Sequence, residues 1–192
     1  MTALSNTAKT AFNLFVLREL PWSAFDFPRW QSVLLITVIG LLMGLDPFMQ
    51  VPMPAPLVVL LLFGMMIAWT GLMPVVAFLK WWMRRGTRWD GQGNLFNLVV
   101  ASCSVANILG AGLLAVGVPM LLTLPLWLYS IWVIANALNG AIPKASLRYS
   151  IGGIVLSLIP SILAVALLSG VMVALGLVSP EMMPPPVPMP SI

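Results

Sequence analysis

The chain has 192 residues, of which 60% are hydrophobic and only 7% are charged, and its mean hydropathy is +1.04. An average soluble domain carries roughly 25% charged residues, so these few charges cannot cover the surface of a soluble globule. Disordered chains are poor in apolar residues, which excludes disorder as well. The composition therefore predicts an all-α, polytopic membrane protein.

The residues that usually carry chemistry are scarce. The chain has no histidine, the common base at neutral pH, and a single cysteine, Cys103. One cysteine excludes an intramolecular disulfide, a Cys-based zinc site and CxxC redox chemistry. The sequence also lacks a GxSxG motif, an HExxH motif and a P-loop. We therefore expect no enzymatic activity, no catalytic residue, no metal and no cofactor.

Residues 1–29 precede the first apolar segment and are expected to form a cytoplasmic N-terminal segment. Within it, residues 5–20 have an imperfect helical spacing of apolar side chains, and Pro21 is expected to end the helix. The apolar run is short and no small-residue cleavage site follows, which argues against a signal peptide. The segment is predicted to be an amphipathic helix in the membrane interface; a poorly ordered terminus is the alternative.

Five apolar segments are candidates to cross the hydrocarbon core, which is ~30 Å thick. They cover about residues 30–45, 57–79, 95–118, 121–138 and 151–178. The first is short, because Asp46 and Pro47 follow it, so a re-entrant segment and a total of four spans are the alternative. The membrane domain is therefore predicted over residues 30–178. A flexible proline-rich tail is predicted over residues 179–192.

The positive charges follow a simple pattern along the chain. Three of the nine cations precede the first segment, and the other six lie between segments two and three or between segments four and five, namely Lys80, Arg84, Arg85, Arg88, Lys144 and Arg148. In a five-span arrangement all nine fall on one side. Lys and Arg concentrate in cytoplasmic loops, so the N-terminus is predicted inside and the C-terminus outside. The expected location is a bacterial inner membrane. The basic loops are also expected to meet anionic lipid, whereas no nucleic-acid partner is expected.

Small residues recur at four-residue spacing within several segments. Such residues let helix backbones approach closely in lipid, where burial of apolar surface does not drive helix association. We predict helix packing at Gly40, Gly44, Ser102, Ala106, Gly110, Gly153, Ser157, Ser161 and Gly170. Chance is the alternative, because small residues are common in membrane helices.

Ionisable residues are absent from the middle of every predicted span, and ion-coupled transporters and proton relays usually need them. The remaining polar candidates inside the membrane are neutral: Asn97, Ser104, Asn107 and Asn136. Hydrogen bonding between helices is their expected role. Contact with a transported solute is the alternative.

One stretch of the chain is similar to a known family. A basic loop leads through Gly91-Gln92-Gly93-Asn94-Leu95-Phe96 into the third segment, a close hairpin follows, and the fourth segment contains Leu126-Trp127-Leu128-Tyr129-Ser130-Ile131-Trp132. This pattern resembles the Yip domain of Ypt/Rab-interacting proteins, and especially its small bacterial relatives, over about residues 30–178. The resemblance implies a five-span bundle with a cytoplasmic N-terminus. The acidic cytoplasmic region of the eukaryotic members has no counterpart in residues 1–29, so Rab binding is not implied.

Two functions remain open at this point. The first is a non-enzymatic scaffold, organiser or accessory subunit of a membrane assembly, with a second copy or another membrane protein as partner. The second is a channel or carrier for a neutral or weakly polar solute. The sequence does not name a ligand or a partner.

Overall fold

The computed structural model describes residues 2–45 and 56–177, and in this part of the chain all regular structure is helical. The helices are α1 (Thr2–Phe15), α2 (Arg29–Gly44), α4 (Leu57–Arg84), α5 (Leu95–Ala115), α6 (Met120–Ala141) and α7 (Leu147–Ala174). Two short 3₁₀ turns, η1 (Trp22–Phe25) and η2 (Arg85–Thr87), lie in the connections. The predicted tail over residues 179–192 and the residue Asp46 lie outside the described residues.

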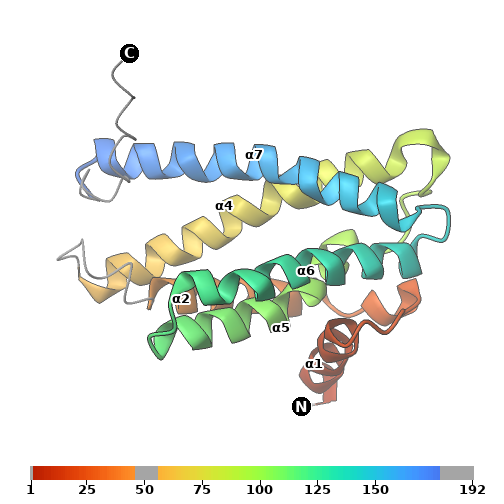
Figure 1. Cartoon of the computed structure of the whole chain (residues 1–192), viewed down its shortest axis with the longest axis horizontal. Helices are drawn as coiled ribbons and strands as arrows, with labels where there is room; N and C mark the ends of the chain where they lie inside the picture. The colour runs from red at the N-terminus through yellow and green to blue at the C-terminus, as the bar shows by residue number, and fades with distance from the viewer. Residues whose placement is uncertain (1, 46–55, 178–192) are drawn as a thin grey trace.

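Four of these helices are long and apolar enough to cross a membrane: α4, α5, α6 and α7. They form a helical bundle in which α4 packs on α7, α5 on α6 and α6 on α7 (Figure 1). The chain is therefore an integral membrane protein. The predicted first span corresponds to α2, which has 16 residues and lies against both α4 and α5. Its length is about 24 Å at 1.5 Å per residue, less than the ~30 Å of a hydrocarbon core.

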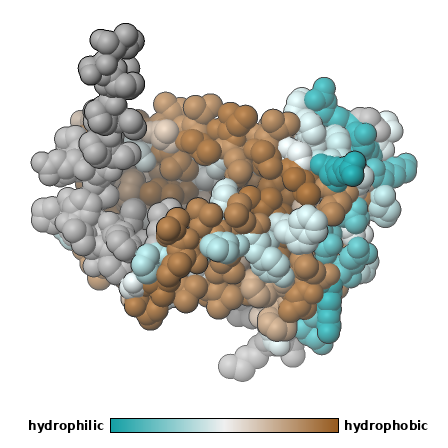
Figure 2. Space-filling view, in the orientation of Figure 1, coloured by the Kyte–Doolittle hydropathy of each residue, from teal (hydrophilic) through white to brown (hydrophobic). Residues whose placement is uncertain are grey.

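The surface of the bundle is divided along its length. Large apolar side chains face outward over the middle, and Figure 2 shows them as a broad hydrophobic band with hydrophilic residues gathered at one end. This is the end at which α4 finishes and α5 begins (Figure 1). Leu121, Ile162 and Leu167 are between 65% and 77% exposed, which suits contact with lipid chains rather than with water.

The best-buried helix is α5. Its residues Leu98, Val99, Val100 and Ala101 are at most 1% exposed. Leu98, Val99 and Ala101 share one core cluster with the buried second half of α6. By contrast, α7 buries few residues and exposes a long apolar face. The packed core therefore lies nearer the hydrophilic end, where α1, α5 and α6 meet.

Helix boundaries differ from the predicted segments by up to five residues, for local reasons. Helix α4 continues past residue 79 to Arg84, because Lys, Trp and Arg tolerate both the helix and the lipid interface. Helix α7 begins at Leu147, where the hydroxyl of Ser146 accepts the amide of Tyr149 as an N-cap. Helix α5 ends at Ala115, because Gly117 adopts φ +84° in a left-handed C-cap.

The N-terminal helix α1 is amphipathic and ends earlier than predicted. It buries Thr7, Ala11 and Leu14 and packs beside the start of α5 (Figure 1). It stops at Phe15 because Leu17 adopts φ +60°, and the amide of Arg18 donates to the carbonyl of Asn13 at 2.9 Å. That bond closes a Schellman cap. The cap turns the chain before Pro21 is reached.

Candidate functional site

Two of the predicted small residues lie at a close approach between helices α2 and α4. A Cβ atom on Gly40 would lie 2.6 Å from the Cα of Met65, and one on Gly44 would lie 2.5 Å from the carbonyl oxygen of Leu60. On the facing helix, a Cβ on Gly64 would collide with the backbones of Gly40 and Gly44. Helices α2 and α4 are thus in backbone contact, and only glycine fits at these three positions. Gly64 was not among the predicted packing residues, although Gly64 and Ala68 have the same four-residue spacing.

The other predicted packing residues occupy varied surroundings. Ser102, Ala106 and Ser157 are buried, and Ser102 and Ser157 bond to carbonyls of their own helices. Gly110 makes an ordinary contact with Leu126. A Cβ on Gly170 would meet no heavy atom within 4 Å. Gly170 is thus an exposed position of the described chain rather than a contact between helices.

One of these positions, Ser161, links α7 to α4. The hydroxyl of Ser161 donates to the carbonyl of Gly71 at 2.7 Å. Pro74 lies close to Gly71 in α4, and Pro160 directly precedes Ser161 in α7. Each proline lacks an N–H and so interrupts the hydrogen bonding of its helix. Ser161 therefore supplies a cross-helix bond in the region where the helices themselves are weakened.

Asn97 was predicted to be a polar residue inside the membrane, and it links three segments. Its Oδ1 accepts the hydroxyl of Ser32 on α2 at 2.8 Å. Its Nδ2 donates to the carbonyls of Phe25 at 2.9 Å and Phe27 at 2.7 Å. The side chain is completely buried. Asn97 thus fixes the chain between α1 and α2 onto α5.

Two of the remaining predicted polar residues, Ser104 and Asn136, also donate hydrogen bonds to backbone carbonyls of the chain. Ser104 is buried and donates to the carbonyl of Ala101 at 3.0 Å. Asn136 donates to the carbonyl of Leu17 at 3.2 Å, and the nearby Tyr129 hydroxyl donates to the carbonyl of Phe15. These two α6 side chains therefore satisfy carbonyls just past the end of α1. Asn107 is half-buried on α5.

The six predicted topology-setting cations lie at the hydrophilic end of the bundle, at the end of α4, in the connection to α5 and at the junction of α6 and α7. The Arg85 guanidinium lies 4.6 Å from the ring centroid of Trp81, and that of Arg88 lies 3.9 Å from that of Tyr149. Arg84 lies 5.6 Å from Trp89. Cation–π contact positions a guanidinium without neutralising it. In the described part of the chain, no ion pair is found for these arginines.

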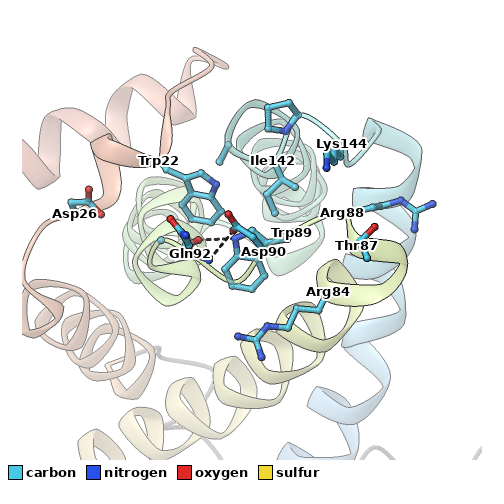
Figure 3. Close-up of a pocket in the computed structure, with 13 residues that line it drawn as sticks. Trp22, Asp26, Arg84, Thr87, Arg88, Trp89, Asp90, Gln92, Ile142 and Lys144 are labelled. Carbon is cyan, nitrogen blue, oxygen red and sulfur yellow. Dashed lines mark hydrogen bonds between the residues drawn. The ribbon is translucent and has the colours of Figure 1, made fainter.

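A cleft of about 700 Å³ opens at this end between three segments that are distant in sequence (Figure 3). Its lining comes from η1, from the connection between α4 and α5, and from the junction of α6 and α7. The charged and aromatic lining residues are Trp22, Asp26, Arg84, Arg88, Trp89, Asp90 and Lys144. In Figure 3, Thr87, Arg88 and Lys144 lie along one edge of the cleft, and Asp26 lies on the opposite side.

The wall of the cleft is held rigidly. The rings of Trp22 and Trp89 stack with centroids 5.8 Å apart, and the Trp89 indole N–H donates to the carbonyl of Gln92 at 2.7 Å. Gly93 has φ +83°, and a Cβ on it would lie 2.6 Å from the Trp22 ring. Gly91 has φ +88° and lies against the Arg84 guanidinium. Gly93 is therefore required by backbone conformation and by space, and Gly91 by its backbone conformation.

One feature of the rim is unusual. Thr87 lines the cleft with φ +55°, a conformation that β-branched residues rarely adopt. Strained backbone of this kind costs of order 1–3 kcal/mol and is concentrated at ligand sites and switches. The cleft therefore combines cations, an aromatic wall and a strained rim.

Sequence reasoning recognised the cations but not the cleft they line. Gly91 and Gly93 were noted only as part of the loop before the third segment. The available signal was the Gly-Gln-Gly-Asn tetrapeptide next to Trp89 and Asp90, which is typical of a tight turn with positive φ values. In the turn, the Asp90 carboxylate accepts the amide of Gln92 at 2.9 Å.

Among residues 2–45 and 56–177, no group of three His, Cys, Asp or Glu side chains is placed to hold a metal ion. Cys103 is buried within α5.

Comparison with known proteins adds no identification: the chain matches no protein-family model, and no curated protein and no solved structure is significantly similar to it.

Proposed function

We propose that the chain crosses the membrane five times, with its N-terminus and basic end in the cytoplasm and its C-terminus outside. In support, α2 lies within the bundle against α4 and α5, and the cations gather at one end. A helix about 24 Å long can cross where Trp and Arg at its start reach the interface and the bilayer thins locally. Trp30, Trp81 and Trp89 at the same end suit an aromatic belt.

The function that we propose is a non-enzymatic scaffold or accessory subunit of a membrane assembly, located in a bacterial inner membrane. The observation that carries it is that Asn97, Ser104 and Ser161, polar side chains within the bundle, are hydrogen-bonded to the chain itself. Asn97 makes three hydrogen bonds to protein groups, and Ser104 and Ser161 each donate to a backbone carbonyl. A solute path through the bundle needs such groups to be available to the solute.

The same hydrogen bonds leave few polar groups for the alternative, a channel or carrier. Of its four proposed lining residues, Asn97 and Ser104 are buried and Asn136 bonds to Leu17. That leaves Asn107, half-buried on α5, as the residue on which a solute path would depend.

The resemblance to the Yip domain is kept as a proposal. It is supported by the helix order and by the Gly91–Asn94 loop, in which both glycines have positive φ and Asn94 caps α5. The contact of a scaffold with a second copy or another membrane protein is proposed at the basic end. The exposed apolar face of α7 is expected to contact lipid rather than a protein partner, so it serves as the negative control.

The test uses the full chain in two assays. In proteoliposomes, permeability to glycerol and urea is measured by stopped-flow light scattering, and the scaffold proposal predicts the value of empty vesicles. In cells, a photo-cross-linker at Arg148, which is exposed at the basic end outside the cleft, is expected to give a discrete adduct with a second copy or with one membrane protein, and one at Ile162 is not. Protein-dependent flux that Asn107→Leu abolishes, while the variant stays folded, would replace the scaffold with a carrier.

A further inference from the structure

The cleft at the basic end has features of a ligand site that the proposed scaffold role does not explain. It is a hollow of about 700 Å³, within the size range of small-molecule sites. Its walls are fixed by the Trp22–Trp89 stack, by Gly93, where a Cβ would collide with the Trp22 ring, and by the positive φ of Gly91. A preformed wall reduces the entropy lost when a ligand binds.

The charge of the cleft is unevenly placed. Arg88 and Lys144 lie along one edge together with Thr87, the Arg88 side chain extends outward from this edge over Tyr149, and Asp26 lies away from them on the other side (Figure 3). Asp90 also lines the cleft, with one carboxylate oxygen engaged by the amide of Gln92. Three cations line the cleft against two acids, so one edge attracts an anion while the remainder offers hydrogen-bond acceptors.

The position of the cleft restricts the source of that anion. It lies where α4 and α6 end and where α5 and α7 begin. These termini carry the aromatic and basic residues typical of the headgroup layer. Arginine and lysine are the usual partners of phosphate oxygens, and a hydroxyl such as that of Thr87 can add a hydrogen bond.

We propose that this cleft binds a glycerophosphate headgroup, with the phosphate between Arg88 and Lys144 and the glycerol hydroxyls toward Asp90. The phosphate complements the cationic edge, and the hydroxyls are donors for the acidic part of the lining. An anionic membrane lipid is the source that fits the position of the cleft. The inference rests on the proposed membrane placement of the basic end and is independent of the scaffold role.

The experiment measures which lipids the full-length protein retains in native mass spectrometry after reconstitution with phosphatidylglycerol, phosphatidylethanolamine and phosphatidylcholine. Wild type is expected to retain phosphatidylglycerol preferentially. The pair Arg88→Gln and Lys144→Gln is expected to lower the retained fraction about tenfold, the size expected for loss of charge-assisted hydrogen bonds. The matched control pair, Lys80→Gln and Arg148→Gln, removes the same charge from exposed positions outside the cleft and is expected to retain the lipid.

Arg88 also lies over Tyr149, so Lys144→Gln alone is included, because Lys144 is exposed and its loss leaves that contact in place. It is expected to weaken retention, and Lys144→Arg is expected to restore it. Equal losses in the site pair and the control pair would overturn the proposal, as would equal retention of phosphatidylethanolamine.

A second experiment distinguishes a membrane lipid from a soluble phosphate compound as the ligand of the cleft. In neutral detergent, millimolar inorganic phosphate or glycerol 1-phosphate is expected to leave the unfolding temperature unchanged. A rise that Lys144→Gln removes would assign the cleft to a soluble phosphate and overturn the lipid source. Failure of lipid binding leaves the flux and cross-linking results untouched, so the two proposals fail separately.

Discussion

Trp82 and Tyr149 join the end of α4 to the start of α7 by hydrogen bonds in both directions. The Trp82 indole N–H donates to the carbonyl of Tyr149 at 3.1 Å, and the Tyr149 hydroxyl donates to the carbonyl of Trp82 at 2.6 Å. Their rings stack with centroids 4.9 Å apart. The pair therefore joins α4 to α7 at the basic end of the bundle. The Arg88 guanidinium lies over the Tyr149 ring, 3.9 Å from its centroid.

This junction depends on the absence of a side chain at Gly153, where a Cβ atom would lie 2.5 Å from Cδ1 of Trp82. We predict that Gly153→Ala displaces the indole and destabilises the protein by about 1–3 kcal/mol, as overpacking does. The neighbouring Gly152→Ala is the control, because a Cβ there meets nothing within 4 Å. Thermal unfolding in detergent measures both. Equal unfolding temperatures for the two variants would contradict the close packing of Gly153 against Trp82.

The contact between α2 and α4 makes a second prediction. Gly64→Ala places a methyl group against the backbones of Gly40 and Gly44, which cannot move aside as a flexible side chain can. We expect the helices to separate, with a loss of about 1–3 kcal/mol and faster proteolysis between α2 and α4. Gly170→Ala, at an open position, is expected to behave like wild type. A fully stable Gly64→Ala variant would show that the two helices do not touch.

Asn97 and Asn107 lie on the same helix but are predicted to respond differently. Asn97→Leu loses three hydrogen bonds and leaves the carbonyls of Phe25 and Phe27 without that partner. At about 1 kcal/mol for each bond, the expected loss is roughly 3 kcal/mol. Asn107→Leu, at a half-buried position, is expected to change the unfolding temperature little. Comparable losses for both variants would contradict the role of Asn97 as a structural link.

Two C-caps give predictions of opposite sign. Leu17 holds φ +60° at the end of α1, and Gly117 holds φ +84° at the end of α5. Because left-handed backbone costs roughly 1–2 kcal/mol for a residue with a Cβ, Leu17→Gly is expected to stabilise the end of α1 and Gly117→Ala to destabilise the end of α5. Hydrogen exchange of the flanking amides reports each effect. Slower exchange is expected in the first variant and faster exchange in the second.

The helical membrane bundle was predictable because apolar length and hydropathy are local properties of the sequence. The segment boundaries were less so, since α7 starts at a Ser146 cap and α5 ends at a Gly117 turn, and neither feature changes the hydropathy much. Gly40 and Gly44 were recognisable from their spacing, whereas their partner Gly64 depends on which helices become neighbours.

The cleft could not be predicted because it is built by residues far apart in the chain. Trp22 stacks on Trp89 across 67 positions, and Lys144 arrives from the junction of α6 and α7. Sequence spacing predicts that Arg88 and Lys144 share a membrane side. It does not show that both face one hollow.

The most direct test of the account is the side of the membrane on which the chain leaves its last helix. A phosphatase that is active only outside the cytoplasm is fused after Val178, and the same enzyme inserted after Arg88 serves as the cytoplasmic reference. Five spans with the basic end inside predict activity at Val178 and none at Arg88. Inactive enzyme at Val178, with the fusion stably produced, would contradict the proposed topology.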